Sequence, residues 1–160
     1  MQIIDIHMSI KGAIDDAIAR AAAIGGLLAV ALIHMLQLPN AFDEIGYLGA
    51  LFIAAIVASL LLATVLTRTS DDRAWAAAGG VATLILLCYI VSRSVGLPGF
   101  TDDIGEWSEP RGLASMVAEG LLAMLSTAVL VTRRYPLGGA ASRSTTGRVA
   151  GGASVDPAIG

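Results

Sequence analysis

The sequence predicts an all-α fold: a four-helix transmembrane bundle with a short amphipathic N-terminal helix and a disordered C-terminal tail. Of its 160 residues, 56% are hydrophobic and only 14% are charged, whereas soluble domains carry about 25% charged residues. The apolar residues fall in four blocks bounded by charged residues, Pro or Gly. Each block approaches the roughly 20 residues that a spanning helix needs. We therefore expect an integral membrane protein with short loops and no separate soluble domain.

Residues 1–20 are predicted to form an amphipathic helix that can lie on the membrane surface. Isoleucines recur there at spacings of three and four residues, from Ile3 to Ile18, and charged side chains occupy the other faces. This pattern is typical of an interfacial helix. No cleavable signal peptide is recognisable, because a compact apolar segment followed by a small-residue cleavage site is missing. Met8 is an alternative start of translation, so the choice between Met1 and Met8 stays open.

The transmembrane domain is expected over residues 21–134, and its four spans follow from the four apolar blocks. We expect spans at residues 21–38, 45–67, 74–92 and 113–132. Pro39 should end the first span, because proline disfavours helix in the residue before it. Trp75, at the inner end of the third span, fits an interfacial anchor. Residues 135–160 are rich in Gly, Ala, Ser and Thr, and they are predicted to be a disordered cytoplasmic tail because they lack the apolar content to fold.

The distribution of Lys and Arg predicts that both termini lie in the cytoplasm. Basic residues cluster before the first span, between the second and third spans, and after the fourth span, and cytoplasmic loops are enriched in such residues. The two other loops then face outward, and their acidic residues are Asp43, Glu44, Asp102, Asp103, Glu106 and Glu109. The formal net charge of −3 argues against a nucleic-acid partner. The predicted location is the plasma (inner) membrane, crossed several times, with the lipid bilayer as partner.

Three ionisable residues lie within the spans or at their ends: His34, Arg93 and Glu119. Such a residue costs about 2.5–3.5 kcal/mol at the bilayer centre, so each needs a structural or functional reason. At a rise of 1.5 Å per residue, His34 lies about 6 Å and Glu119 about 9 Å below the outer surface. Small residues share the helix faces of His34 and Glu119. We therefore expect both side chains to point into the bundle.

These residues suggest a binding pocket that opens outward beneath the acidic loops. The predicted ligand-binding residues are His34, Gln37, Tyr89, Arg93 and Glu119. Imidazole and carboxylate groups can also hold a divalent metal ion. The metal ligands predicted for that case are His34, Glu44, Glu106, Glu109 and Glu119. The structural alternative is an ion pair between Arg93 and Glu119 that joins the third helix to the fourth, with His34 beside it, and proton or electron transfer is a further alternative.

Several classes of function lack the residues that they need. His34 is the only His within a span, whereas a membrane b-type haem needs two axial ligands. Cys88 is the single cysteine, so an internal disulfide and a CxxC motif are excluded. Walker A, Rossmann and nucleophile-elbow motifs are missing as well. We therefore predict no catalytic residues and a protein that binds rather than catalyses.

Two segments resemble a group of small four-helix integral membrane proteins of actinobacteria and related bacteria. They are IHMLQLP in the first span and SRSVGLPGFTDDIGEWSEPRGLASMVAEG, which leads into the fourth. The matching positions are His34, Pro39, Glu44, Ser92, Arg93, Gly96, Leu97, Pro98, Glu109, Pro110, Gly112 and Glu119. Arg111 occupies the variable position of the Glu-Pro-x-Gly turn. The resemblance covers about residues 30–120 and implies a shared polar site at the outer face, but it implies no activity.

Three functions stay open at this point. The first is a binding or accessory membrane protein with an acidic outward pocket that can take a cation. Its expected partner is another protein or further copies of the same chain. The second is a subunit of a membrane redox or metal enzyme, which requires a bound cofactor such as a divalent metal ion. The third is a small oligomeric transporter or channel, because four helices are few for a transporter and a pore would have to lie between subunits.

Overall fold

The structure, a computed structural model, describes residues 2–135 and the side chains of residues 10–135. Its helices in chain order are α1 (Gln2–Glu44), α2 (Gly46–Arg68), α3 (Asp72–Ser94) and α4 (Pro110–Arg134). All four are long and apolar enough to cross a membrane, so the predicted four-helix transmembrane bundle is confirmed. Residues 136–160, nearly all of the predicted disordered tail, lie outside the described residues.

α1 is one uninterrupted helix, which corrects two expectations. The predicted N-terminal helix of residues 1–20 is not a separate element, because the stretch that follows it is rich in Ala and Leu and contains no proline before Pro39, so the helix continues through Gly25 and Gly26. The helix also passes through Pro39 and ends only at Glu44. Proline removes a backbone hydrogen bond here without ending the helix. Packing against α2 holds the last turn of α1. The Phe42 ring lies so close to Gly49 of α2 that a Cβ added to Gly49 would be 2.5 Å from the ring.

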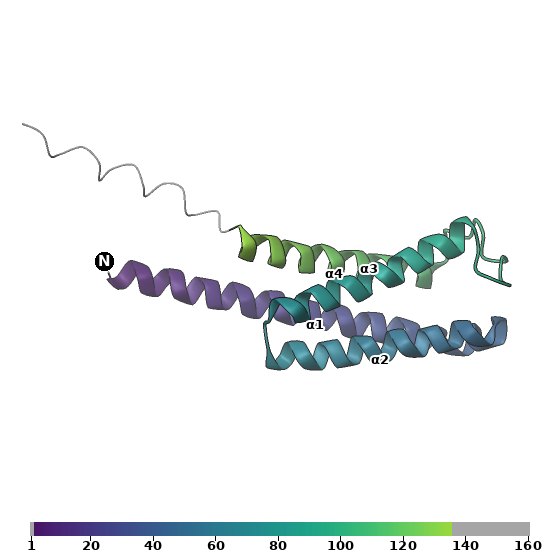
Figure 1. The fold of residues 1–160 in the computed structure, drawn as a ribbon, viewed down its shortest axis with the longest axis horizontal. Coiled ribbons are helices and arrows are strands. Elements are labelled where there is room, and N and C mark those ends of the chain that lie inside the picture. The colour runs from purple at the N-terminus through teal and green to yellow at the C-terminus, as the bar shows by residue number, and fades with distance from the viewer. Residues whose placement is uncertain (1, 136–160) are drawn as a thin grey trace, which may run out of the picture.

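The helices run alternately up and down, so both described ends of the chain lie at the same end of the bundle (Figure 1). α2, α3 and α4 have 23 to 25 residues each. Their length of about 35 Å matches a hydrocarbon core of about 30 Å. α1 has 43 residues and is therefore about 64 Å long. Its N-terminal part extends beyond the other helices (Figure 1).

Packing is uneven around the bundle. α1 lies mainly against α2, and α3 lies mainly against α4, whereas α2 and α3 make the fewest contacts of the neighbouring pairs. The core includes Trp75, which is fully buried and is therefore not the interfacial anchor that we expected. Near it, Gly79 lets α3 approach α4 closely, because a Cβ at this position would lie 2.8 Å from the Cβ of Ser126. Such close approach at small residues is what holds helices together in lipid.

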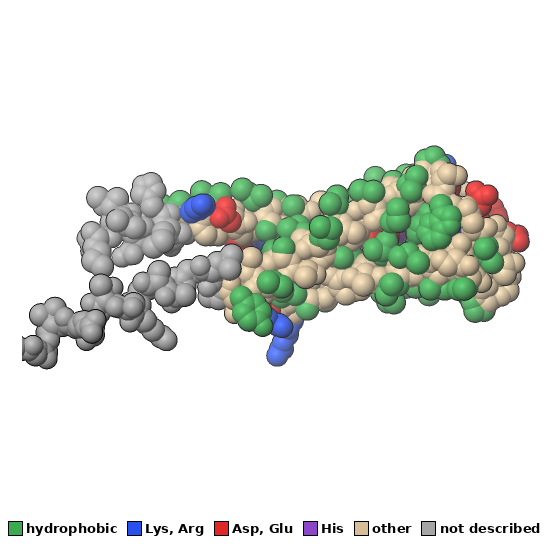
Figure 2. Space-filling model, turned by 90° about the horizontal axis from the view of Figure 1, so that it is seen from above, with side chains coloured by type: hydrophobic (Ala, Val, Ile, Leu, Met, Phe, Trp, Pro, Cys, Tyr) green, Lys and Arg blue, Asp and Glu red, His purple; other side chains and the backbone are tan. Residues whose placement is uncertain are grey.

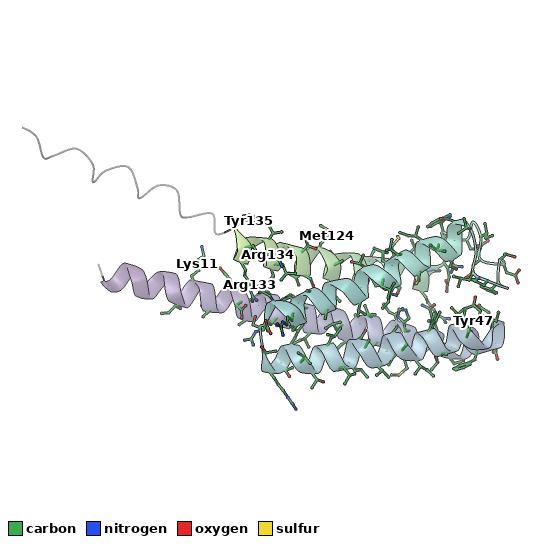
Figure 3. The ribbon with its side chains drawn as sticks, viewed as in Figure 1. Lys11, Tyr47, Met124, Arg133, Arg134 and Tyr135 are labelled. Atoms are coloured by element: carbon green, nitrogen blue, oxygen red, sulfur yellow. The ribbon has the colours of Figure 1, made fainter. Side chains whose placement is uncertain are left out.

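A polar cluster closes the end of the bundle at which both described chain ends lie. We call it the Arg133 cluster, and its members are Asp16, Ser70, Asp72, Trp75 and Arg133. Arg133 Nη2 lies 2.6 Å from Asp16 Oδ1, and its Nη1 lies 2.9 Å from Asp72 Oδ1. Both nitrogens also donate to Ser70, whose hydroxyl accepts a further hydrogen bond of 3.3 Å from Trp75 Nε1. One arginine of α4 thus joins α1, the α2–α3 turn and α3 (Figure 3).

The loop between α3 and α4 turns back sharply over the other end of the bundle. Leu97 and Phe100 exchange two backbone hydrogen bonds of 2.7 and 2.9 Å. Pro98 and Gly99 form the corner between them, and the φ angle of 76° at Gly99 is the positive value that a type II turn requires. The loop leads into Pro110, which begins α4 at a position where the missing N–H of proline costs no hydrogen bond.

Candidate functional site

A cleft of about 490 Å³ lies between α2 and α3, at the end of the bundle that the α3–α4 loop covers. Acidic side chains gather at this end of the molecule (Figure 2). We divide the cleft into a polar mouth and an apolar slot. The polar mouth is lined by Gln37, Asn40, Glu44, Tyr89, Ser92, Arg93, Asp103, Glu106 and Glu109. The apolar slot is lined by Leu48, Leu51, Phe52, Ala54, Ala55, Ala58, Val81, Leu84, Ile85 and Cys88.

The cleft brings together most of the ligand-binding residues that the sequence predicts. His34 and Gln37 line it from α1, and Tyr89 and Arg93 line it from α3. The fifth residue, Glu119, lies beside the cleft. Its carboxylate accepts a hydrogen bond of 2.6 Å from Ser115, which lines the cleft from α4. Three helices therefore contribute polar side chains to one cavity.

The predicted metal ligands do not gather in one group. Glu44, Glu106 and Glu109 line the polar mouth, His34 lines the cleft from α1, and Glu119 is not part of the wall. Among residues 10–135, no three side chains of the types His, Cys, Asp and Glu are placed to hold a metal ion. The geometry thus gives the metal site no support, and that site stays a prediction.

Arg93 pairs with the α3–α4 loop and not with Glu119. Its Nη1 lies 2.5 Å from Asp103 Oδ2, and its Nη2 lies 3.0 Å from Glu109 Oε2. The arginine side chain is only 8% exposed, and its guanidinium carbon lies 5.2 Å from the centre of the Tyr89 ring. The ion pair between Arg93 and Glu119 was a wrong expectation, because Glu119 lies about 14 Å along α4 from the start of that helix, whereas Arg93 is at the loop end of α3.

The loop is fastened over the polar mouth from two sides. On α2, the hydroxyl of Tyr47 donates a hydrogen bond of 2.8 Å to the carbonyl oxygen of Pro98. On α3, the Tyr89 ring meets the edge of Trp107 with 6.2 Å between ring centres. Gly112 provides the space for this tyrosine, since a Cβ at Gly112 would lie 2.8 Å from the Tyr89 ring. These contacts hold the acidic residues of the loop beside the cleft.

His34 and Glu119 are buried between α1 and α4, as the small residues on their helix faces predicted. They are 5% and 0% exposed. His34 Nδ1 lies 2.9 Å from the carbonyl oxygen of Val30. Because a carbonyl oxygen only accepts hydrogen bonds, Nδ1 is the donor in this bond, and Nε2 is the ring nitrogen that takes no part in it. This Nε2 is 4.0 Å from Glu119 Oε1, which is too far for a hydrogen bond.

The polar mouth has an excess of negative charge. Asp103 and Glu109 share Arg93, which is the only Lys or Arg among the described residues that line the cleft. Within the part of the chain whose side chains are described, no ion pair reaches the other two carboxylates, those of Glu44 and Glu106. The mouth can therefore attract a positively charged group, since its own arginine is already neutralised.

Comparisons with known proteins do not place the chain in a family. No protein-family model matches it, and no curated protein or solved structure matches it. The resemblance to small actinobacterial membrane proteins therefore stays a prediction. Evidence for a function comes from the chemistry of the cleft.

Proposed function

We propose that the protein is a non-enzymatic membrane protein that binds a positively charged ligand group in the polar mouth. The observation that carries this proposal is that Glu44 and Glu106 lie in the wall of a cavity and have no basic partner among the described side chains. The cavity volume of about 490 Å³ falls within the range of about 300–1,000 Å³ that is common for small-molecule sites. Both carboxylates are exposed, so a positively charged group can reach them from the surrounding solution.

The polar mouth is proposed to face outward from the plasma membrane. Lys11, Arg133 and Arg134 lie at the opposite end of the bundle (Figure 3), and cytoplasmic segments are enriched in Lys and Arg. This orientation places both termini in the cytoplasm. A reporter fused to the C-terminus should give a cytoplasmic signal, whereas an external signal would reverse the orientation.

Thermal unfolding in a mild detergent tests the binding proposal. A ligand that binds only the folded protein raises the melting temperature, so Mg²⁺, Zn²⁺ and propylamine are each added to the purified chain. We expect stabilisation by at least one of these cations. It should be lost in the double variant Glu44→Gln/Glu106→Gln. The matched control is Asp43→Asn/Asp102→Asn, which changes two acidic residues outside the cleft wall. A melting temperature unchanged by all three cations would contradict the proposal.

Metal content per chain separates this proposal from a redox or metal enzyme. The protein is purified in mild detergent without an affinity-tag metal and compared with His34→Ala. A stoichiometric metal that is lost in the variant would establish a metal centre and favour the enzyme. No metal in either protein would leave an organic cation as the ligand. Cross-linking in native membranes tests the remaining alternatives, because a pore requires a homo-oligomer and an accessory subunit requires a partner protein.

A further inference from the structure

We propose that the ligand is a single-chain amphiphile with a primary ammonium head, which enters the cleft sideways from one leaflet of the bilayer. This inference rests on the proposed function, because it names the ligand of the same polar mouth. The polar mouth and the apolar slot form one continuous cavity. A molecule that fills both parts needs a positively charged head and a hydrocarbon tail.

The apolar slot suits a hydrocarbon tail and is open toward the surface of the bundle. Its α2 wall is formed by the small side chains of Ala54, Ala55 and Ala58, which leave room beside α3. Leu51 and Leu84 border it and are 53% and 62% exposed, so they lie where lipid would contact the helices. The few contacts between α2 and α3 make this side of the bundle the natural point of entry.

The length of the slot matches one leaflet of a bilayer. Its α2 wall runs from Leu48, beside the polar mouth, to Ala58. At a rise of 1.5 Å per residue this distance is about 15 Å, and the hydrocarbon core of a bilayer is about 30 Å thick. A tail in the slot would therefore end near the midplane, as the tails of the surrounding lipids do.

The chemistry of the mouth favours an ammonium head over other head groups. A primary ammonium has a positive charge and three N–H donors but no acceptor. Glu44 and Glu106 offer carboxylate oxygens in the wall of the mouth, and the side-chain amide oxygens of Gln37 and Asn40 are further acceptors there. An anionic head would be repelled, because Arg93 is already paired with two carboxylates.

Cys88 provides a direct test, because it is the only cysteine of the chain and lines the apolar slot. The rate of its alkylation by a membrane-permeant maleimide is measured with the full chain in vesicles of uncharged lipid. Dodecylamine, propylamine and laurate are added at equal concentrations. We expect dodecylamine to slow the alkylation at least fivefold, while propylamine and laurate change the rate less than twofold. Protection by laurate equal to that by dodecylamine would overturn the inference, because it would show that the charged head is not recognised.

Two controls keep this test specific. Cys88→Ala combined with Val91→Cys moves the thiol to an exposed position of α3 that does not line the cleft, and dodecylamine should leave its rate unchanged. Ala58→Leu should abolish the protection of Cys88 by filling the slot. Ala50→Leu should preserve this protection, because Ala50 lies on the exposed surface of α2 outside the cleft.

If propylamine raises the melting temperature through Glu44 and Glu106 but dodecylamine does not protect Cys88, this inference fails and the proposed function stands. If neither effect is seen and metal ions do not stabilise the protein either, both fail.

Discussion

The two ends of the bundle use the same ionic motif in different surroundings. At one end Arg133 pairs with Asp16 and Asp72, and at the other end Arg93 pairs with Asp103 and Glu109. Behind the Arg133 cluster lie the packed core residues of all four helices. Behind Arg93 lies a cleft of about 490 Å³. An arginine with two carboxylates therefore does not by itself mark a functional site.

The two ends differ in whether carboxylates remain unpaired after the ion pairs have formed. In the Arg133 cluster the side chains of Ser70 and Trp75 complete a hydrogen-bond network that joins three helices. At the polar mouth, Glu44 and Glu106 line an open cavity without a basic partner in the described part of the chain. We infer that the packed end stabilises the bundle, and this stability allows α2 and α3 to stay apart at the other end.

The sharpest test of this comparison replaces the two tryptophans, one at each end. Trp75 is fully buried, whereas Trp107 is 43% exposed. Trp75→Ala should lower the free energy of unfolding by about 3–5 kcal/mol, because it leaves a cavity in the core. Trp107→Ala should cost less than about 1 kcal/mol, as for most surface positions. The two losses in free energy of unfolding are to be measured by SDS titration in mixed micelles, with unfolding followed by circular dichroism. Equal losses would show that the mouth is packed as tightly as the opposite end.

The fold was predictable because a bilayer imposes a length on each span. Four apolar blocks of spanning length were visible in the sequence, and the four helices of residues 2–135 cover them except for Ile45, which is the N-cap of α2. The inward direction of His34 and Glu119 was predictable for a similar reason, since the small residues on their helix faces mark the packing side. Both predictions depend only on periodicity and composition within one helix.

Features that depend on contacts between elements were not predictable. The continuation of α1 through Pro39 depends on the fit of Phe42 against Gly49 of α2, which local propensity does not contain. The partners of Arg93 depend on the path of the loop, and the sequence could not show which of its acidic residues would return to α3. Asp103 was therefore missing from the predicted site, although it makes the shorter of the two ion pairs with Arg93.

Glycine substitutions compare the packing of the two ends directly. Gly79→Ala places a methyl group 2.8 Å from the Cβ of Ser126, and such overpacking should cost about 1–3 kcal/mol because two helix backbones must separate. Gly112→Ala meets the Tyr89 ring at the same distance, but this ring borders the cleft and can turn into it. We therefore expect a loss below about 1 kcal/mol, less than the usual cost of overpacking.

The control for both glycine variants is Gly80→Ala, since a Cβ at Gly80 would meet nothing within 4 Å. This change should raise the free energy of unfolding by up to about 1 kcal/mol through helix propensity alone. The same SDS titrations measure all three variants. A loss for Gly112→Ala as large as that for Gly79→Ala would show that Tyr89 is fixed and that the mouth is rigid.

The smallest expected difference in stability is between variants of two serines of α4, Ser115 and Ser126. Ser115 donates a hydrogen bond of 2.6 Å to Glu119, while the Ser126 hydroxyl is buried without a hydrogen-bond partner among the described residues. Ser115→Ala should cost about 1–2 kcal/mol, because a buried carboxyl oxygen loses its donor. Ser126→Ala should change the free energy of unfolding by less than about 0.5 kcal/mol, since it removes no hydrogen bond and keeps the Cβ that packs on Gly79.

Ser115→Thr separates the lost hydrogen bond from a change in packing, because it keeps the hydroxyl group beside Glu119. If the hydrogen bond is what matters, Ser115→Thr should retain most of the stability that Ser115→Ala loses, measured in the same titration. A loss for Ser126→Ala equal to that for Ser115→Ala would instead mean that the Ser126 hydroxyl has a partner in the membrane. The packed end would then depend on polar contacts as much as the end that holds the cleft.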